Sequence, residues 1–265
     1  MKGFFGKKTE KIFDLHNLEL DKLALYVLPR FVFEIIRKYF RLDVEGLENV
    51  PSRGRAIVLP NHSGWTGLDA VMIGNEIFKQ KHRVPRVLAH KAWFLGDIKM
   101  VSVKMGMIEA STENALRYLK KNNVVVLFPE GEYGNFKPSS ERYHLQEFKR
   151  GFVRMALATG APIIPTLVIG AEESNINLAS LKFAKYLKGQ IIPIPLNVLP
   201  LPAKWKIKFL PPIRFSEYSP KDAENGELVH NLAAEVQAKM QSALNEELKH
   251  RKWVYFPPEE TNLRA

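Results

Sequence analysis

Apolar residues gather in short runs that alternate with segments of helical periodicity. Runs rich in β-branched residues indicate buried strands, and spacings of three and four residues indicate helices. A short strand with its turn is predicted at 42–51, and further strands at 56–59, 84–90, 105–110, 124–128, 162–169 and 205–210. Helices are predicted at 68–79, 113–121, 148–159 and 228–248, with a partly helical apolar stretch at 93–103. This alternation predicts an α/β fold, a sheet with helices on its faces.

The last helical pattern is the most regular of the chain. Its apolar residues recur every four positions, which predicts a stripe packed on the core. The stripe consists of Leu228, Leu232, Val236, Met240, Leu244 and Leu248. We expect residues 253–256 to pack on the body of the protein and residues 257–265 to form a polar tail.

The N-terminal segment combines an apolar face with a basic one. From Leu28 the apolar positions follow helical spacing, and Pro29 either kinks the segment or opens its second helix. The basic face carries Arg30, Arg37, Lys38 and Arg41. Two interpretations remain open, a helix packed on the core or one lying in a membrane interface, and the basic charge favours the membrane. We therefore divide the chain into an N-terminal amphipathic, membrane-associating segment (1–41), a main domain (42–256) and a tail (257–265).

Charge and composition restrict the partners and the compartment. The 265 residues include 39 basic and 28 acidic ones, a net charge of +11 that favours an anionic partner. There are no cysteines and no histidine cluster with metal-ligand spacing, so we expect no disulfide and no metal site. No apolar run approaches the roughly 20 residues of a membrane span, and no signal-peptide core follows the basic start. Basic residues are dispersed without a nucleic-acid motif, so we expect no nucleic-acid partner.

Two polar motifs directly follow predicted strands. Asn61, His62 and Ser63 follow the first, with Asp69 at the start of the next helix; Phe128-Pro129-Glu130-Gly131 follows another. Carboxyl ends of strands are where α/β sheets bind ligands, and histidine suits general-base chemistry near neutral pH. A histidine and an aspartate at this spacing are more often a hydrogen-bonded loop and a helix cap. Two polar motifs that both follow predicted strands are less easily explained as a coincidence.

Together these motifs resemble the glycerolipid acyltransferases, the family that includes lysophosphatidic acid acyltransferases. Four blocks match over roughly 42–215: Asn61-His62 with Asp69, residues 106–115, Phe128-Pro129-Glu130-Gly131, and Ala161–Pro165. The resemblance implies a mixed, mainly parallel sheet flanked by helices. It also implies acyl transfer from acyl-CoA or acyl-carrier protein to a hydroxyl of a lysophospholipid or related glycerolipid.

In this resemblance His62 is the general base and Asp69 orients its ring. Substrate binding is assigned to Asn61, Ser63, Glu130 and Gly131, with Glu130 holding an acceptor hydroxyl or supporting its loop. Backbone amides on the Gly64–Gly67 loop or around Gly131 are candidate donors to the oxyanion. No protein nucleophile, metal or bound cofactor is implied; the acyl thioester is a co-substrate. The location implied is the cytoplasmic face of a membrane, in peripheral association.

The chain departs from the family pattern in three respects. The common spacing places the aspartate five positions after the histidine, where this chain has Gly67, so a bulge through Gly64 and Gly67 must bring Asp69 to the ring. A family arginine thought to hold the acceptor's phosphate is missing, and Glu109, Ala110 and Glu132 occupy the corresponding neighbourhoods. A basic set follows instead, which is either a solvated loop or a site for phosphate or coenzyme A: Lys137, Arg142, Lys149 and Arg150.

Two further alternatives remain open. The unusual spacing also fits a membrane- or lipid-binding protein on the same fold without catalysis. The segment 191–202 is apolar and rich in proline, which disfavours a helix or a central strand and predicts a loop. This loop either dips into the bilayer, lines an acyl channel or folds over the core.

Overall fold

A computed structural model describes residues 28–64, 66–96, 98–182 and 191–256. The chain divides into two compact units, Met1–Arg41 and Leu42–Ala265. In the first unit the described residues form the helix α2, Leu28–Tyr39, which exposes Phe31, Val32 and Ile35. Among the described helices, none has both the length and the hydrophobicity that a membrane-spanning segment needs. The expected polar tail lies outside the described residues.

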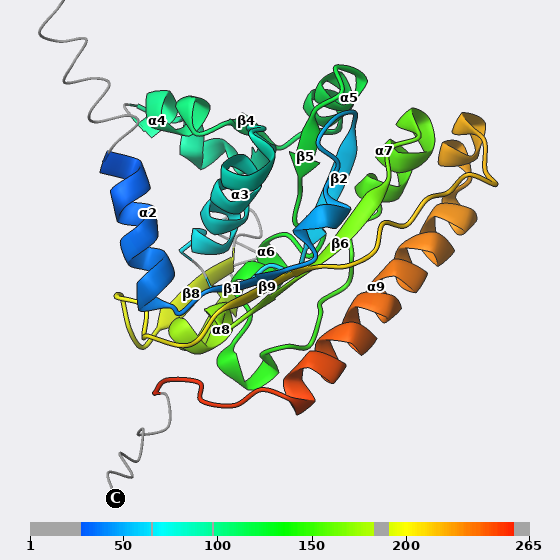
Figure 1. Ribbon diagram of the computed structural model, residues 1–265. Helices are drawn as coiled ribbons and strands as arrows, with labels where there is room; N and C mark the ends of the chain where they lie inside the picture. The colour runs from blue at the N-terminus through cyan, green and yellow to red at the C-terminus, as the bar shows by residue number, and fades with distance from the viewer. Residues whose placement is uncertain (1–27, 65, 97, 183–190, 257–265) are drawn as a thin grey trace, which may run out of the picture. The chain divides into compact units, whose positions relative to one another are not determined.

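Within the described part of the second unit, seven strands form one sheet in the order β1-β9-β6-β2-β5-β3-β4 (Figure 1). Neighbouring strands are parallel except for β6 and β9, which are antiparallel. The mixed, mainly parallel sheet expected from the sequence is therefore correct. Its strands are β1 (Asp43–Glu45), β2 (Ala56–Pro60), β3 (Arg86–Ala89), β4 (Met107–Glu109), β5 (Val124–Val126), β6 (Ile163–Ile169) and β9 (Lys206–Phe209).

The helices cover both faces of the sheet (Figure 1). One face packs with α5 (Thr112–Lys120), α7 (Gly151–Thr159) and α9 (Gly226–Lys249) into the main hydrophobic core. The predicted stripe of α9 belongs to this core, with Leu232, Val236, Met240 and Leu244 buried. The other face carries α3 (Leu68–Lys81), beyond which lies α4 (Ile98–Lys104). Short helical segments complete the chain: η2 (Leu47–Asn49), η3 (Lys91–Phe94), α6 (Glu132–Asn135), η4 (Ser139–Glu141), α8 (Ala171–Ser174) and η5 (Pro220–Glu224).

The sequence prediction was wrong at residues 191–195. This stretch is not a loop but a strand, β8 (Ile191–Pro195), which pairs antiparallel with β7 (Asn177–Lys182) in a separate two-stranded sheet. A strand with only one partner needs hydrogen-bonding groups along one edge, so Pro193 and Pro195 are tolerated there. The strand β7 was not predicted.

The central strands position the two polar motifs. β2 pairs parallel with β5 on one side and with β6 on the other, and every residue of all three strands is buried. Parallel neighbours end at the same edge of the sheet. The segment after β2, which carries His62, and the segment after β5, which carries Glu130, therefore meet at this edge.

Candidate active site

His62 and Asp69 are in direct contact. The Nδ1 atom of His62 lies 2.8 Å from Oδ2 of Asp69, whose side chain is fully buried. The same carboxylate oxygen accepts the Ser63 amide at 3.0 Å, and Oδ1 accepts the Ala70 amide at 2.7 Å. Because an ionised carboxylate only accepts hydrogen bonds, Nδ1 carries the proton, and the lone pair of Nε2 is left for another partner.

Two glycines allow the longer spacing between His62 and Asp69. Gly64 and Gly67 both adopt left-handed backbone conformations, with φ angles of 70° and 73°. Gly67 immediately precedes α3, so Asp69 lies in the first turn of that helix. The bulge expected from the sequence is therefore present, and it brings the carboxylate to the ring despite the two additional residues.

The ring of His62 is fixed on its other side by Phe128. The two rings stack with centroids 4.0 Å apart, and the side chain of His62 keeps 16% of its surface exposed. That surface belongs to a cavity of about 720 Å³, whose lining is mainly apolar and includes Val87, Leu127 and Phe152. This volume lies within the range of about 300–1,000 Å³ typical of small-molecule sites. A weakly solvated base at an apolar cavity suits a reaction on a hydrophobic substrate.

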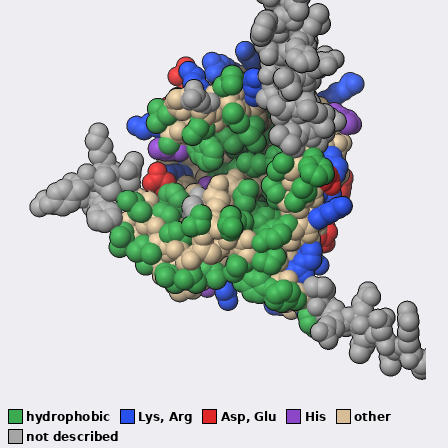
Figure 2. Space-filling model, turned by 90° about the vertical axis from the view of Figure 1, so that its left-hand side faces the viewer, with side chains coloured by type: hydrophobic (Ala, Val, Ile, Leu, Met, Phe, Trp, Pro, Cys, Tyr) green, Lys and Arg blue, Asp and Glu red, His purple; other side chains and the backbone are tan. Residues whose placement is uncertain are grey.

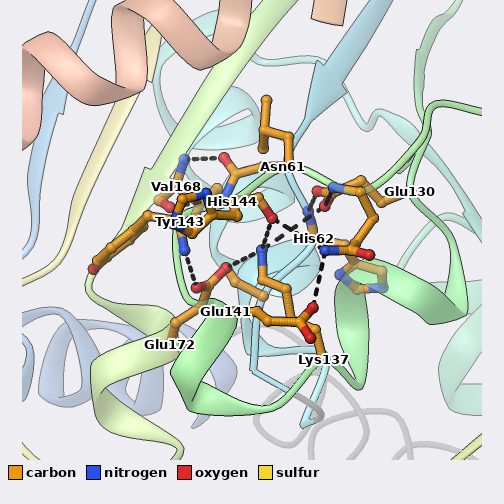
Figure 3. Close-up of polar contacts among 12 residues, drawn as sticks. Asn61, His62, Glu130, Lys137, Glu141, Tyr143, His144, Val168 and Glu172 are labelled. Carbon is orange, nitrogen blue, oxygen red and sulfur yellow. Dashed lines mark hydrogen bonds and ion pairs between the residues drawn. The ribbon is translucent and has the colours of Figure 1, made fainter.

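Glu130 does not line the cavity, and its carboxylate lies beside the backbone of His62 (Figure 3). Its Oε1 accepts the backbone amide of His62 at 2.9 Å, and its Oε2 accepts that of Gln146 at 2.7 Å. The side chain is completely buried. Both carboxylate oxygens therefore hold backbone, and one of them fixes the residue that carries the imidazole.

Lys137 joins Glu130 to a second buried acid, Glu172 of α8 (Figure 3). The Lys137 ammonium lies 2.8 Å from Oε1 of Glu172 and 3.8 Å from Oε2 of Glu130, and donates to the carbonyl of His144 at 3.0 Å. Only 4% of its side chain is exposed. Glu172 in turn accepts the amide of Tyr143 at 2.6 Å. One buried cation thus serves two buried carboxylates.

Burial raises the pKa of Glu172 to about 7, although the Lys137 ammonium beside it acts in the opposite direction. The folded protein therefore keeps this proton up to about pH 7, whereas the unfolded chain releases it near 4.5. Between these values the unfolded state binds fewer protons, so the free energy of unfolding falls as the pH rises. The stabilisation is complete below about pH 4.5 and is lost above about pH 7.

We predict that Glu172→Gln flattens this dependence on pH. The slope between pH 5 and 7 corresponds to a change on the order of 3 kcal/mol in the parent protein, and should largely disappear. Denaturant unfolding at several pH values measures it. Glu235→Gln, which removes an exposed carboxylate of α9, is the control that should retain the slope. An unchanged slope in Glu172→Gln would show that another group titrates.

The other residues assigned from the sequence take different positions. The Asn61 side chain is buried and bridges β2 to β6 through both the amide and the carbonyl of Val168, at 2.7 and 3.0 Å (Figure 3). Ser63 is buried, and its hydroxyl has no hydrogen-bond partner within the described residues. Gly131 lines the cavity, but its N–H donates to Phe128, as that of Gly67 does to Gly64. These two amides are therefore already engaged.

The basic set of the sequence does not converge on one place. Lys137 is buried in the carboxylate cluster, and neither Arg142 nor Arg150 lines the cavity. Lys149 does line it, against Gly131, where an added Cβ would lie 2.8 Å from its ammonium nitrogen. Within the described residues, no group of three or more acidic or histidine side chains is arranged to hold a metal ion.

Gly134 of α6 provides a test of how closely Glu130 is held. A Cβ added there would lie 2.5 Å from Cβ and 2.8 Å from Cδ of Glu130. We predict that Gly134→Ala displaces Glu130, lowers the free energy of unfolding by about 1–3 kcal/mol and reduces any activity that depends on His62. Gly226→Ala is the control, since nothing lies within 4 Å of its added Cβ. Unchanged stability in Gly134→Ala would contradict the rigid packing described here.

Comparisons with known proteins show which family the chain resembles. The family model described as Acyltransferase matches residues 41–169. An uncharacterized protein of Mycobacterium tuberculosis, Rv0502, is 36% identical over 242 residues, which are 86% of this chain and 67% of that protein. A 1-acyl-sn-glycerol-3-phosphate acyltransferase of Cocos nucifera is 29% identical over 135 residues, 49% of this chain and 41% of that protein.

A solved structure shows the same fold. The 1-acyl-sn-glycerophosphate (LPA) acyltransferase PlsC of Thermotoga maritima superposes with a TM-score of 0.53 and 20% identity, covering 84% of this chain and 82% of that one. The match of the family model includes both strand-end motifs and the central strands of the sheet. The chain therefore belongs to the glycerolipid acyltransferase family.

Proposed function

We propose that this protein transfers a fatty acyl group from an acyl thioester, acyl-CoA or acyl-carrier protein, to a hydroxyl of a lysophospholipid or related glycerolipid. One observation carries the proposal: Nδ1 of His62 is held by the buried Asp69, and the exposed part of the same side chain lines a mainly apolar cavity. That is the arrangement a general base needs when its substrate is a lipid alcohol. The carboxylate also offsets the charge of the imidazolium that forms.

The proposed reaction proceeds without a protein nucleophile. Nε2 of His62 takes the proton of the acceptor hydroxyl as its oxygen attacks the thioester carbon. The tetrahedral intermediate then expels the thiolate, which receives the proton back from the imidazolium, so that the products are an ester and a free thiol. The Ser63 hydroxyl takes no part, since it is buried beside Asp69 and its amide is bound to that carboxylate.

In this proposal Glu130 positions His62 and does not touch the acceptor. Both of its oxygens are occupied by backbone amides, and the side chain is not exposed to the cavity. Asn61 likewise fixes the strand end through Val168. Lys149 is the cation we assign to an anionic group of the bound substrates, because it lines the cavity that also contains His62.

We further propose that the protein works in peripheral association with a membrane, at its cytoplasmic face, where acceptor lipids and acyl thioesters meet. The net charge of +11 supports attraction to anionic headgroups. No bound cofactor or metal takes part in the proposed reaction, for which the acyl thioester is the co-substrate.

A substrate panel tests the function. Purified protein is incubated with detergent-solubilised lysolipids and either acyl-CoA or acyl-carrier protein, and free thiol is followed together with the ester product. We expect thiol release that depends on the acceptor and is lost in His62→Ala. Absence of transfer across both donors and all acceptors, with a folded protein, would favour a lipid-binding protein without catalysis on the same fold.

A further inference from the structure

Exposed hydrophobic side chains are concentrated on two segments of the Leu42–Ala265 unit. Among its described residues this unit exposes 19 large hydrophobic side chains, and 14 of them lie on residues 93–105 or 178–199. Soluble proteins seldom gather so many on one region unless it binds a partner or a membrane. The first segment contains the end of η3 and all of α4, and the second contains β8, most of β7 and the turn after β8.

The helix α4 is apolar around most of its circumference. Ile98, Met100, Val101 and Val103 are each at least half exposed, and Ser102 alone among its seven residues is buried. The Ser102 hydroxyl donates to the carbonyl of Trp93 at 2.7 Å, which anchors α4 to η3. A short helix held through its polar residue thus presents its apolar side chains outward.

The turn after β8 is equally apolar and firmly built. Val198 and Leu199 are 74% and 82% exposed. The side-chain amide of Asn197 donates to the carbonyls of Ser174 and Leu199 at 2.9 and 2.7 Å, and its oxygen accepts the amide of Ile176 at 2.9 Å. These bonds hold the exposed pair at the tip of an ordered turn.

Both segments border the cavity that contains His62. Trp93 of η3 and Ile192 of β8 are exposed and also line this cavity. Figure 2 shows hydrophobic side chains gathered around a hollow on the face of the molecule that carries α4 and β8. The apolar lining of the cavity therefore continues outward onto both segments.

The charges around this surface suit an anionic partner. Lys99 and Lys104 are exposed on the first segment, and Lys91 is exposed just before it. The sequence from Lys91 to Met105 contains one acidic residue, Asp97. The stretch from Ile191 to Pro202 contains no charged residue. An apolar surface with lysines at its side is the combination that inserts among lipid chains beneath anionic headgroups.

We propose that α4, the strands β7 and β8 and the turn after β8 form one membrane-docking surface, and that the cavity of His62 opens into the bilayer beside α4 and β8. A lipid acceptor would then pass from the membrane to the imidazole without crossing water. The inference rests on the proposed function for the nature of this acceptor. The docking itself is measured without substrate, so failure of one proposal is distinguishable from failure of the other.

Vesicle binding of the full chain tests the proposal. Vesicles of phosphatidylcholine with phosphatidylglycerol are sedimented with the parent protein, with Met100→Gln/Val101→Gln and with Val198→Ser/Leu199→Ser. We expect each double substitution to lower the partition coefficient by roughly tenfold or more, because it removes two inserted apolar side chains. The control is Phe78→Gln, which replaces a side chain of 41% exposure on α3, outside both segments.

Two lysine double variants test the electrostatic contribution to vesicle binding. Lys99→Gln/Lys104→Gln should weaken binding to the anionic vesicles roughly tenfold or more and leave binding to pure phosphatidylcholine unchanged. Lys120→Gln/Lys121→Gln, just before the amino end of β5, is the control that should bind like the parent. The two apolar double variants should also differ from the parent in their kinetics. They should need a higher concentration of vesicle-embedded acceptor to reach the same rate. Their turnover of a short-chain acceptor that is monomeric in solution should be unchanged.

Vesicle binding as tight as that of the parent in both apolar double variants would overturn the proposal. That result is expected if residues 1–41 carry the whole membrane affinity, or if a second copy of the chain covers this surface. Analytical ultracentrifugation identifies the second case as a dimer that the substitutions dissociate. Circular dichroism shows that each variant is folded, which is expected because every replaced side chain is exposed.

Discussion

Replacing His62 with alanine is expected to lower the rate of acyl transfer by about 10³-fold, within the range of about 10²–10⁴ that a general base contributes. The imidazole is the group that the structure orients from three sides, with Asp69 at Nδ1, Phe128 against the ring and Glu130 at the backbone amide. Rate measurements at saturating acceptor determine the loss. The control is His230→Ala, whose side chain is exposed on α9.

The same account predicts a comparable loss for Asp69→Asn, roughly 10²–10⁴-fold. An asparagine cannot accept both the ring N–H of His62 and the Ser63 amide while also accepting the amide of Ala70, as both oxygens of the carboxylate now do. The ring would then lose its tautomer and its orientation. Either variant retaining more than a tenth of the parent rate would exclude the assigned roles.

Replacing Lys137 with methionine is expected to have the largest effect on stability. The substitution keeps most of the side-chain volume but leaves Glu130 and Glu172 buried without their cation. Breaking a buried ion pair costs about 3–5 kcal/mol, because the remaining charge is neither hydrated nor paired. Denaturant unfolding measures this loss. Activity should fall as well, since Glu130 holds the amide of His62.

The dependence of this loss on pH identifies its cause. Because burial raises the pKa of Glu172 to about 7, this carboxyl can take a proton at pH 5, and Lys137→Met should be less destabilising there than at pH 8. Adding Glu172→Gln should recover part of the stability. The control Lys239→Met breaks an exposed pair with Glu235 and should cost less than about 1 kcal/mol. If Lys137→Met also lowered the free energy of unfolding by less than about 1 kcal/mol, Lys137 would not stabilise the two buried carboxylates electrostatically.

The sequence predicted the parts of the site that depend on strand order and backbone freedom. Both motifs follow buried runs, and the parallel pairing of β2 with β5 brings their ends together. Gly64 and Gly67 were recognisable as residues that permit a bulge, and the structure has both in left-handed conformations. Such local rules need no knowledge of distant contacts.

The roles of the charged residues were not predictable in the same way. Glu130 precedes a glycine in a polar turn, which usually indicates an exposed side chain, yet its partners are backbone amides of His62 and Gln146. Every residue except proline has a backbone N–H, so the sequence pattern does not indicate which of these groups a carboxylate will bind. Lys137 was grouped with other basic residues along the chain, whereas its partner Glu172 lies beyond three further secondary-structure elements. The structure is needed to distinguish Lys137, which is buried, from Lys149, which lines the cavity.

A single-turnover experiment tests direct transfer by His62 most directly. Enzyme in excess is mixed with an acyl thioester, with and without the lipid acceptor identified by the panel, and thiol, ester and the intact mass of the protein are followed together. The account predicts that thiol and ester appear in equal amounts and only with acceptor, while the protein mass never increases by an acyl group. Thiol release without acceptor, accompanied by an acylated protein, would contradict it.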